Sequence, residues 1–285
     1  MNQFKKLNNY IGWSIFLIAS FVYLSTIEQT VSFWDCGEYI ATAYKLEVGH
    51  PPGAPFFQLF GRIFTLFASQ GTSEVAVAIN ILSALCSSFA ILFLFWTITA
   101  FGRKLFLNDE KEIELGRIIA VLGSGAVGAL AYTFSDSFWF SAVEGEVYAM
   151  SSLFTAVTFW CIMKWEEESD KPHASRWLVL IGYLIGLSIG VHLLSLLTIP
   201  AMGMIYYFKK YSYTKAGAIK AFVVSMVMLG LVQGVIIPGA VSLISKFELF
   251  FVNTIGLPFN SGTIIYFFAI IGAITYGLIY TKKHN

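Results

Sequence analysis

Long apolar runs alternate with short polar stretches along most of this 285-residue chain. A helix needs about 20 apolar residues to cross a hydrocarbon core about 30 Å thick, and by this criterion the pattern predicts about eight membrane spans. The expected fold class is therefore an all-α integral membrane protein built as a multi-helix bundle. The predicted spans are Tyr10–Ile27, Val75–Phe101, Ile118–Phe134, Val147–Met163, Trp177–Gly190, Leu193–Phe208, Ala221–Ser245 and Thr263–Thr281.

Two segments interrupt this pattern. Gly190-Val191-His192 and Pro200 divide the stretch Trp177–Phe208, so we expect two short helices there rather than one long helix. Ala54–Ala68 is apolar but short, and it carries Arg62 near its centre. We therefore expect this segment of the long first loop to form an interfacial helix rather than a span.

The lysines and arginines are concentrated in a few of the polar stretches. If the N-terminus is cytoplasmic, all but three of the 18 basic residues fall on the cytoplasmic side, the exceptions being Lys45, Arg62 and Lys246. Cytoplasmic loops are enriched in Lys and Arg, so this orientation is favoured. It predicts that both termini lie inside and that the segment Ser32–Phe57 lies outside.

The overall composition excludes two broad classes of protein. Charged residues make up 12% of the chain, whereas soluble globular domains carry about 25%. No basic patch with interleaved aromatic residues indicates a nucleic-acid partner. The three cysteines, Cys36, Cys86 and Cys161, are scattered, and they predict neither a disulfide framework nor a zinc site.

The outer segment contains an acid pair and a histidine. Asp35 and Glu38 are three residues apart, which places both carboxylates on one face of a helix. Partial desolvation at the membrane boundary should raise their pKa values, as suits a general base. His50-Pro51-Pro52-Gly53 is predicted to form a stiff turn that presents His50 beside the acids. The alternative is a pair of solvated acids followed by a structural elbow.

Later outer segments supply further candidates. Glu144 and Tyr148 are four residues apart and would share a helix face, with Glu146 to one side. His192 lies in the predicted turn of the short hairpin, as a ligand or as a packing residue. A phosphate group on the outer side of the membrane would find few cationic side chains to bind it. Arg62 is the first choice for it, because a guanidinium can bind phosphate in a bidentate fashion, unless it only snorkels to the surface.

Three motifs in order carry a family resemblance: FWDCGEYIATAYKLEVGHPPGAPFFQLFGR, SAVEGEVYAMSSLF and GLSIGVHLLSLLTIPA. They resemble a family of membrane proteins long labelled as of unknown function and now grouped, as glycosyltransferase family 117, with O-mannosyltransferase-like enzymes. The resemblance covers roughly Tyr10–Phe208. It implies a GT-C fold, a polyprenyl-phosphate sugar as donor, a protein Ser or Thr hydroxyl as acceptor, and an active site facing the periplasm or the lumen of the endoplasmic reticulum.

The resemblance also implies residue roles. Asp35 matches the acid that serves as catalytic base in GT-C enzymes, and Glu38 is the second acid of that motif. A divalent metal held by Asp35 with Glu144 or Glu146 is left open, and the sequence identifies no other cofactor. The candidate substrate-binding residues are His50, Arg62, Glu144, Glu146, Tyr148 and His192.

The expected organisation is a single membrane domain, 1–285, with a GT-C-like core at 10–208 and two further spans at 221–245 and 263–281. Family members are usually longer, so a short form or a fragment lacking a soluble region is expected. Two rival functions are a lipid or solute transporter or flippase, and a non-catalytic envelope assembly subunit. The predicted spans contain no Asp, Glu, Lys or Arg in their interiors, which favours chemistry at the membrane surface over transport.

Overall fold

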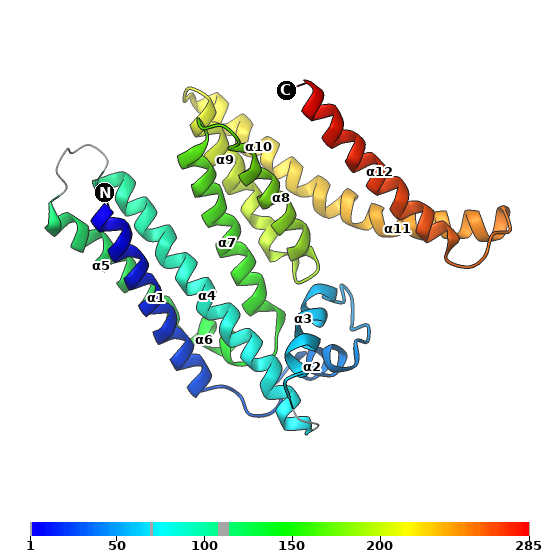
Figure 1. Cartoon of the computed structure of the whole chain (residues 1–285), viewed down its shortest axis with the longest axis horizontal. Helices are drawn as coiled ribbons and strands as arrows, with labels where there is room; N and C mark the ends of the chain where they lie inside the picture. Colours follow the sequence, from blue (N-terminus) through cyan, green and yellow to red (C-terminus); the bar gives the residue numbers. More distant parts are fainter. Residues whose placement is uncertain (1, 69–70, 108–113, 285) are drawn as a thin grey trace. The chain divides into compact units, whose positions relative to one another are not determined.

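The computed structural model describes residues 2–68, 71–107 and 114–284 (Figure 1). Within these ranges all regular secondary structure is helical. The chain divides into two compact units, Met1–Ala218 and Ile219–Asn285, each of which is described by itself. The first unit contains the predicted core 10–208 and the second contains the two further predicted spans.

Helix α4 (Thr72–Phe106) is the central element of the first unit. It packs against α1 (Asn2–Ser25), α5 (Leu115–Thr133) and α7 (Val147–Glu168), and Figure 1 shows it running between α1 and α7. Its apolar residues lie on all sides, which is the pattern of a helix enclosed by other helices. Accordingly, two thirds of its most apolar stretch is buried.

Six helical stretches in the described ranges are long and apolar enough to cross a membrane. The hairpin predicted within 177–208 contains two shorter helices, α8 (Ser175–Ile189) and α9 (Thr198–Lys210), joined through the 3-10 turn η1 (Leu193–Leu197). The predicted break at Gly190-Val191-His192 is therefore confirmed. The chain crosses the membrane eight times if α8 and α9 both cross, and six times if neither does. In both cases the segments after α9 lie on the same side of the membrane, because a pair of crossings returns the chain to the side from which it started.

Three short helices lie in the connections. The first connection contains α2 (Cys36–Lys45) and α3 (Pro55–Thr65), and α6 (Asp136–Val143) precedes α7. With eleven residues, α3 is about 16 Å long at 1.5 Å per residue, roughly half of the hydrocarbon thickness. The expectation that Ala54–Ala68 is helical is therefore confirmed, and α3 is too short to cross the membrane as a single helix. Its interfacial position stays a prediction.

The second unit is built mainly from two long helical stretches. The first runs without interruption from Lys215 to Thr254, through α10 (Lys215–Leu231), the π-helical turn η2 (Val232–Ile236), α11 (Ile237–Leu249) and a second π-helical turn η3 (Phe250–Thr254). The second is α12 (Ser261–His284), which packs against α11. The predicted spans 221–245 and 263–281 lie within these stretches.

Candidate functional site

Three of the connections predicted to lie outside meet at one end of the first unit. The Glu28 backbone N–H, just after α1, donates to the Val143 carbonyl at the end of α6 at 3.1 Å. The Phe56 N–H at the start of α3 donates to the Gly190 carbonyl after α8 at 2.7 Å. The Cys36 thiol on α2 donates to the Glu146 carboxylate at 3.7 Å. The three sequence motifs therefore build one site.

His50 joins the two acids of the first motif. Asp35 occupies the N-cap position of α2, without a side-chain capping hydrogen bond, and Glu38 lies in the first turn of that helix. The imidazole Nδ1 of His50 lies 3.0 Å from Glu38 Oε2, and its Nε2 lies 3.9 Å from Asp35 Oδ2. The backbone N–H of His50 donates to the other oxygen of Glu38. This group of three residues, the acid–imidazole cluster, confirms the predicted position of His50 beside the acids.

The turn that delivers His50 depends on glycine at two places. The Gly53 N–H donates to the His50 carbonyl at 2.8 Å, closing a turn that contains a cis Pro51–Pro52 bond. Gly53 has φ +84°, a left-handed conformation that side-chain-bearing residues rarely adopt. At Gly49, a Cβ would lie only 3.0 Å from Glu38 Oε1. The backbone can thus approach the carboxylate closely enough to hydrogen-bond it.

The electrostatics of this cluster differ from the expectation for Glu38. Hydrogen bonds from the backbone and side chain of His50 lower the pKa of Glu38, so the predicted upward shift is wrong for this residue. The same side-chain hydrogen bond raises the pKa of His50. Donated hydrogen bonds and a nearby cation favour the charged carboxylate over the neutral acid, and they outweigh desolvation at this exposed position.

A second group, the buried carboxyl cluster, consists of Cys36, Glu144 and Glu146. Glu144 and Glu146 lie in extended backbone between α6 and α7, with φ, ψ of −123°, 157° and −127°, 159°. The expectation that Glu144 and Tyr148 share a helix face is therefore wrong, because α7 begins only at Val147. Alternate residues of an extended segment project to the same side, and both glutamates are 5% exposed.

Burial dominates the chemistry of this second cluster. Desolvation raises the pKa of Glu144, partly offset by the Ser32 and Cys36 side chains. Desolvation also raises the pKa of Glu146, and the charges of Glu144 and Asp35 add to that effect. The Glu144 Oε2 atom is buried without a hydrogen-bond partner in the described part of the chain. These two carboxyls are thus suited to holding a proton.

The predicted metal ligands Asp35 and Glu144 fall in different clusters. The acid–imidazole cluster and the buried carboxyl cluster each offer three ligand atoms within 4.8 Å of one another. The first supplies two carboxylates and an imidazole, all exposed, which fit a divalent cation. The second includes the Cys36 thiol, whose pKa burial raises, and this disfavours the thiolate that a metal needs.

Tyr39 was not singled out from the sequence, although it lies four residues after Asp35 on the same helix. Its ring is buried, 5.9 Å from the His50 ring. Burial raises the pKa of Tyr39 to about 12, and the charges of Glu146 and Asp35 contribute. Tyr39 thus lies between the two clusters. The i, i+4 spacing was the signal available for finding it.

Tyr148 and His192 are brought together at the edge of this region. Their ring centroids lie 5.4 Å apart. The Nδ1 atom of His192 accepts the Leu194 backbone N–H at 3.1 Å, so the imidazole caps the turn η1. Burial lowers the pKa of His192, which favours its neutral form.

Arg62 is held at the opposite end of α2 from the acids. Its guanidinium donates to the Tyr44 carbonyl at 2.8 Å and lies 5.3 Å from the centroid of the Tyr44 ring. Tyr44 follows Asp35 by nine residues, which is about 13 Å along a helix axis. The structure therefore does not bring Arg62 to the acid–imidazole cluster, and its role at a phosphate stays a prediction.

These features define a class of protein, a helical multi-pass membrane protein whose connections at one end of the first unit form one polar site. Residues 35–215, more than half of the chain, match the family described as "Protein O-mannosyl-transferase TMEM260 N-terminal domain". The chain therefore belongs to this family, and the resemblance drawn from its three motifs is confirmed.

Two relatives are similar over more than half of the chain. The chain is 28% identical over 196 residues to "Protein O-mannosyl-transferase tmem260" of Dictyostelium discoideum, which covers 65% of the chain and 22% of that relative. It is 27% identical over 180 residues to "Protein O-mannosyl-transferase TMEM260" of Mus musculus, covering 62% of the chain and 22% of the relative. The chain thus spans about a fifth of the length of these curated relatives. No solved structure matches it.

Proposed function

We propose that this chain is the membrane core of a GT-C glycosyltransferase. It moves a sugar, with mannose the first candidate, from polyprenyl phosphate to a Ser or Thr hydroxyl of a protein. The names of the two relatives support transfer of mannose to protein. The reaction occurs on the extracytoplasmic face, the periplasmic side of a bacterial inner membrane or the lumenal side of the endoplasmic reticulum.

Asp35 is the proposed base, and its side chain is 58% exposed and accessible to an acceptor. It takes the proton of the acceptor hydroxyl while the hydroxyl oxygen forms a bond to the anomeric carbon. The bond from that carbon to the phosphate oxygen breaks, and polyprenyl phosphate leaves with the electron pair. Attack from the side opposite the leaving group inverts the anomeric configuration.

The position of His50 is the observation that carries this proposal. Its imidazole is bound to Glu38 and faces Asp35 at 3.9 Å. We assign Glu38 the task of keeping His50 protonated and in place. The resulting positive charge beside Asp35 offers an electrostatic partner to a departing phosphate.

The other candidate residues have supporting roles in this proposal. Glu146 and Tyr148 line the acceptor side in this proposal, and His192 contacts the donor phosphate, because Arg62 lies at the far end of α2 from the acids. A divalent cation is the alternative to a protonated His50: the acid–imidazole cluster would hold it through Asp35, Glu38 and a neutral imidazole, and the cation would then neutralise charge on the leaving group. Chelation in the transfer assay tests for that cofactor.

The central experiment compares Asp35→Asn with Asp136→Asn in membranes supplied with polyprenyl-phosphate mannose and a Ser/Thr-containing protein acceptor. Asp136 is the matched control, because it is an exposed aspartate at the start of α6. A loss of transfer by about 10²-fold or more is expected for Asp35→Asn alone, as for removal of a general base. Near-normal transfer by Asp35→Asn at equal protein level would exclude Asp35 as the base.

A further inference from the structure

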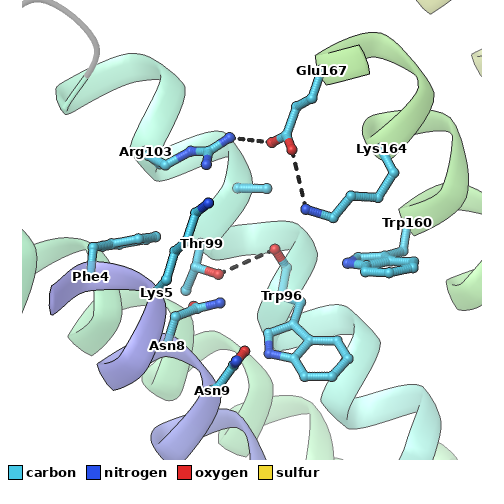
Figure 2. Close-up of a pocket in the computed structure, with 11 residues that line it drawn as sticks. Phe4, Lys5, Asn8, Asn9, Trp96, Thr99, Arg103, Trp160, Lys164 and Glu167 are labelled. Carbon is cyan, nitrogen blue, oxygen red and sulfur yellow. Dashed lines mark hydrogen bonds and ion pairs between the residues drawn. The ribbon is translucent and has the colours of Figure 1, made fainter. Parts of the chain in front are cut away.

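A basic pocket lies at the other end of the first unit. Helices α1, α4 and α7 together enclose a cavity of about 320 Å³, shown in Figure 2. Asp35 and its neighbours follow α1 and precede α4, whereas this pocket is built from the first turns of α1 and the last turns of α4 and α7. Its lining includes Phe4 and Lys5 of α1, Trp96 and Arg103 of α4, and Trp160, Lys164 and Glu167 of α7.

The separation of the two sites matches a membrane. Lys164 lies 18 residues after Glu146, so the basic pocket is about 27 Å from the buried carboxyl cluster along α7. A hydrocarbon core is about 30 Å thick. The basic pocket and the acid–imidazole cluster therefore face opposite leaflets if α7 spans the bilayer.

The basic pocket has an uncompensated positive charge. Glu167 is the single acid among its lining residues, and it pairs with both Arg103 and Lys164, the latter at 3.1 Å. Lys5 contributes a third cation from α1, with no hydrogen bond or ion pair to any residue in the described ranges. Figure 2 shows its amine pointing toward the same space as the other two. One carboxylate cannot neutralise three cations.

Below these charges the wall of the pocket is aromatic. The rings of Trp96 and Trp160 lie 6.0 Å apart, and Lys164 Nζ lies 5.4 Å from the centroid of the Trp160 ring. Phe4 is buried beside them. The indole N–H of Trp96 is buried without a hydrogen-bond partner in the described part of the chain. The basic pocket therefore suits an anion that carries a short apolar extension, because the cations can contact the anion and the aromatic rings can contact the extension.

We propose that this basic pocket binds the phosphate headgroup of a lipid from the leaflet opposite the acid–imidazole cluster. The three cations contact the phosphate and the aromatic wall receives the first carbons of the lipid chain. Basic pockets between membrane helices suit anionic headgroups for this reason. A soluble phosphate shares the charge of the headgroup but has no apolar part. This proposal does not depend on the transfer reaction.

The test uses the purified full chain in phosphatidylcholine nanodiscs that contain a small fraction of phosphatidic acid, with bound phosphatidic acid measured by native mass spectrometry. Lys5→Ala should lower occupancy by about five-fold, the effect of one lysine near a charged surface, whereas Lys5→Arg retains it. Lys6→Ala is the matched control. It removes the same charge one position along α1, outside the lining of the pocket. Equal losses for Lys5→Ala and Lys6→Ala, or no loss for either, would overturn the proposal.

A second arm separates the two sources of phosphate. Inorganic phosphate is titrated onto the chain in nanodiscs of phosphatidylcholine alone, and binding is followed by thermal stabilisation. Weak or undetectable binding supports the lipid assignment, because the aromatic wall then contributes to affinity. Stabilisation that saturates at the same concentration as phosphatidic acid and disappears in Lys5→Ala would instead assign the pocket to a soluble anion.

Discussion

His50 lies 3.0 Å from the carboxylate of Glu38, twelve residues earlier in the chain. The contact is made because the turn at Pro51-Pro52-Gly53 reverses the chain after α2, and because Gly49 leaves room for the carboxylate. The same turn places the His50 imidazole 3.9 Å from the carboxylate of Asp35. Four predictions follow from this arrangement and from its neighbours.

The Glu38–His50 contact should be visible as a coupled titration. The pKa of His50 is raised above its ordinary value of 6.5, so its stabilising contribution is complete below pH 6.5 and is lost as pH rises through the folded-state pKa. The pKa of Glu38 is lowered from 4.5, so its contribution is present above that pH and is lost on acidification. The pair is therefore strongest between pH 4.5 and 6.5.

We expect Glu38→Gln to lower the pKa of His50, because it removes the charge that stabilises the imidazolium. NMR of labelled histidine, recorded across pH in detergent micelles, measures the change. Glu47→Gln is the control, since Glu47 is an exposed acid in the same loop. An unchanged titration of His50 in Glu38→Gln would contradict the contact.

Replacing a buried acid should stabilise the first unit at neutral pH. Burial raises the pKa of Glu144, so the folded state is most stable when Glu144 is protonated and loses that stability as pH rises through the raised pKa. Glu144→Gln removes this penalty and should raise Tm by about 2–4 °C, the shift that corresponds to about 1 kcal/mol in a chain of this size. Thermal unfolding measured at pH 5 and pH 8 checks it. The increase in Tm caused by Glu144→Gln must be larger at pH 8 than at pH 5. A Tm below that of the unsubstituted chain at both pH values would argue against a protonated Glu144 carboxyl.

The docking of α3 onto the end of α8 should tolerate no side chain at Gly190. A Cβ there would lie 2.9 Å from Phe56 Cβ and would separate the Phe56 N–H from its carbonyl partner. We expect Gly190→Ala to destabilise the chain by about 1–3 kcal/mol, the usual effect of overpacking. Gly186→Ala, on the same helix with nothing within 4 Å of its added Cβ, is the control. Thermal unfolding compares the two variants, and equal stabilities would refute the contact.

The orientation of the chain can be read from cysteine labelling. Val48 is 93% exposed in the first connection, whereas Cys36, Cys86 and Cys161 are buried and give a low background. An impermeant maleimide should label Val48→Cys in intact cells or sealed right-side-out vesicles. Lys171→Cys, an exposed site after α7, should react only after permeabilisation. The reverse pattern would move the acid–imidazole cluster to the cytoplasmic side.

Much of the local structure was predictable from short-range pattern. The apolar runs predicted the long helices, because span length depends only on the number of consecutive apolar residues. The short helix within Ala54–Ala68 was predictable because its apolar stretch is shorter than a span. The break at Gly190-Val191-His192 was predictable because glycine and proline interrupt helices locally. The turn at His50 was predictable since proline and glycine restrict the backbone locally.

The sequence by itself determined that this is a helical membrane protein with an acid pair beside a stiff turn, and it predicts that most of the basic residues lie on one side. The tertiary structure alone decided which groups meet. Glu144 and Glu146 are extended and buried because Gly145 packs between Asn80, Ile40 and Ile79, where a Cβ would lie about 3 Å from each. Helical spacing cannot foresee such packing, since it joins residues far apart in the chain. Contacts between residues distant in the sequence also place the Arg62 guanidinium against Tyr44. They likewise place Tyr39 between the acid–imidazole cluster and the buried carboxyl cluster.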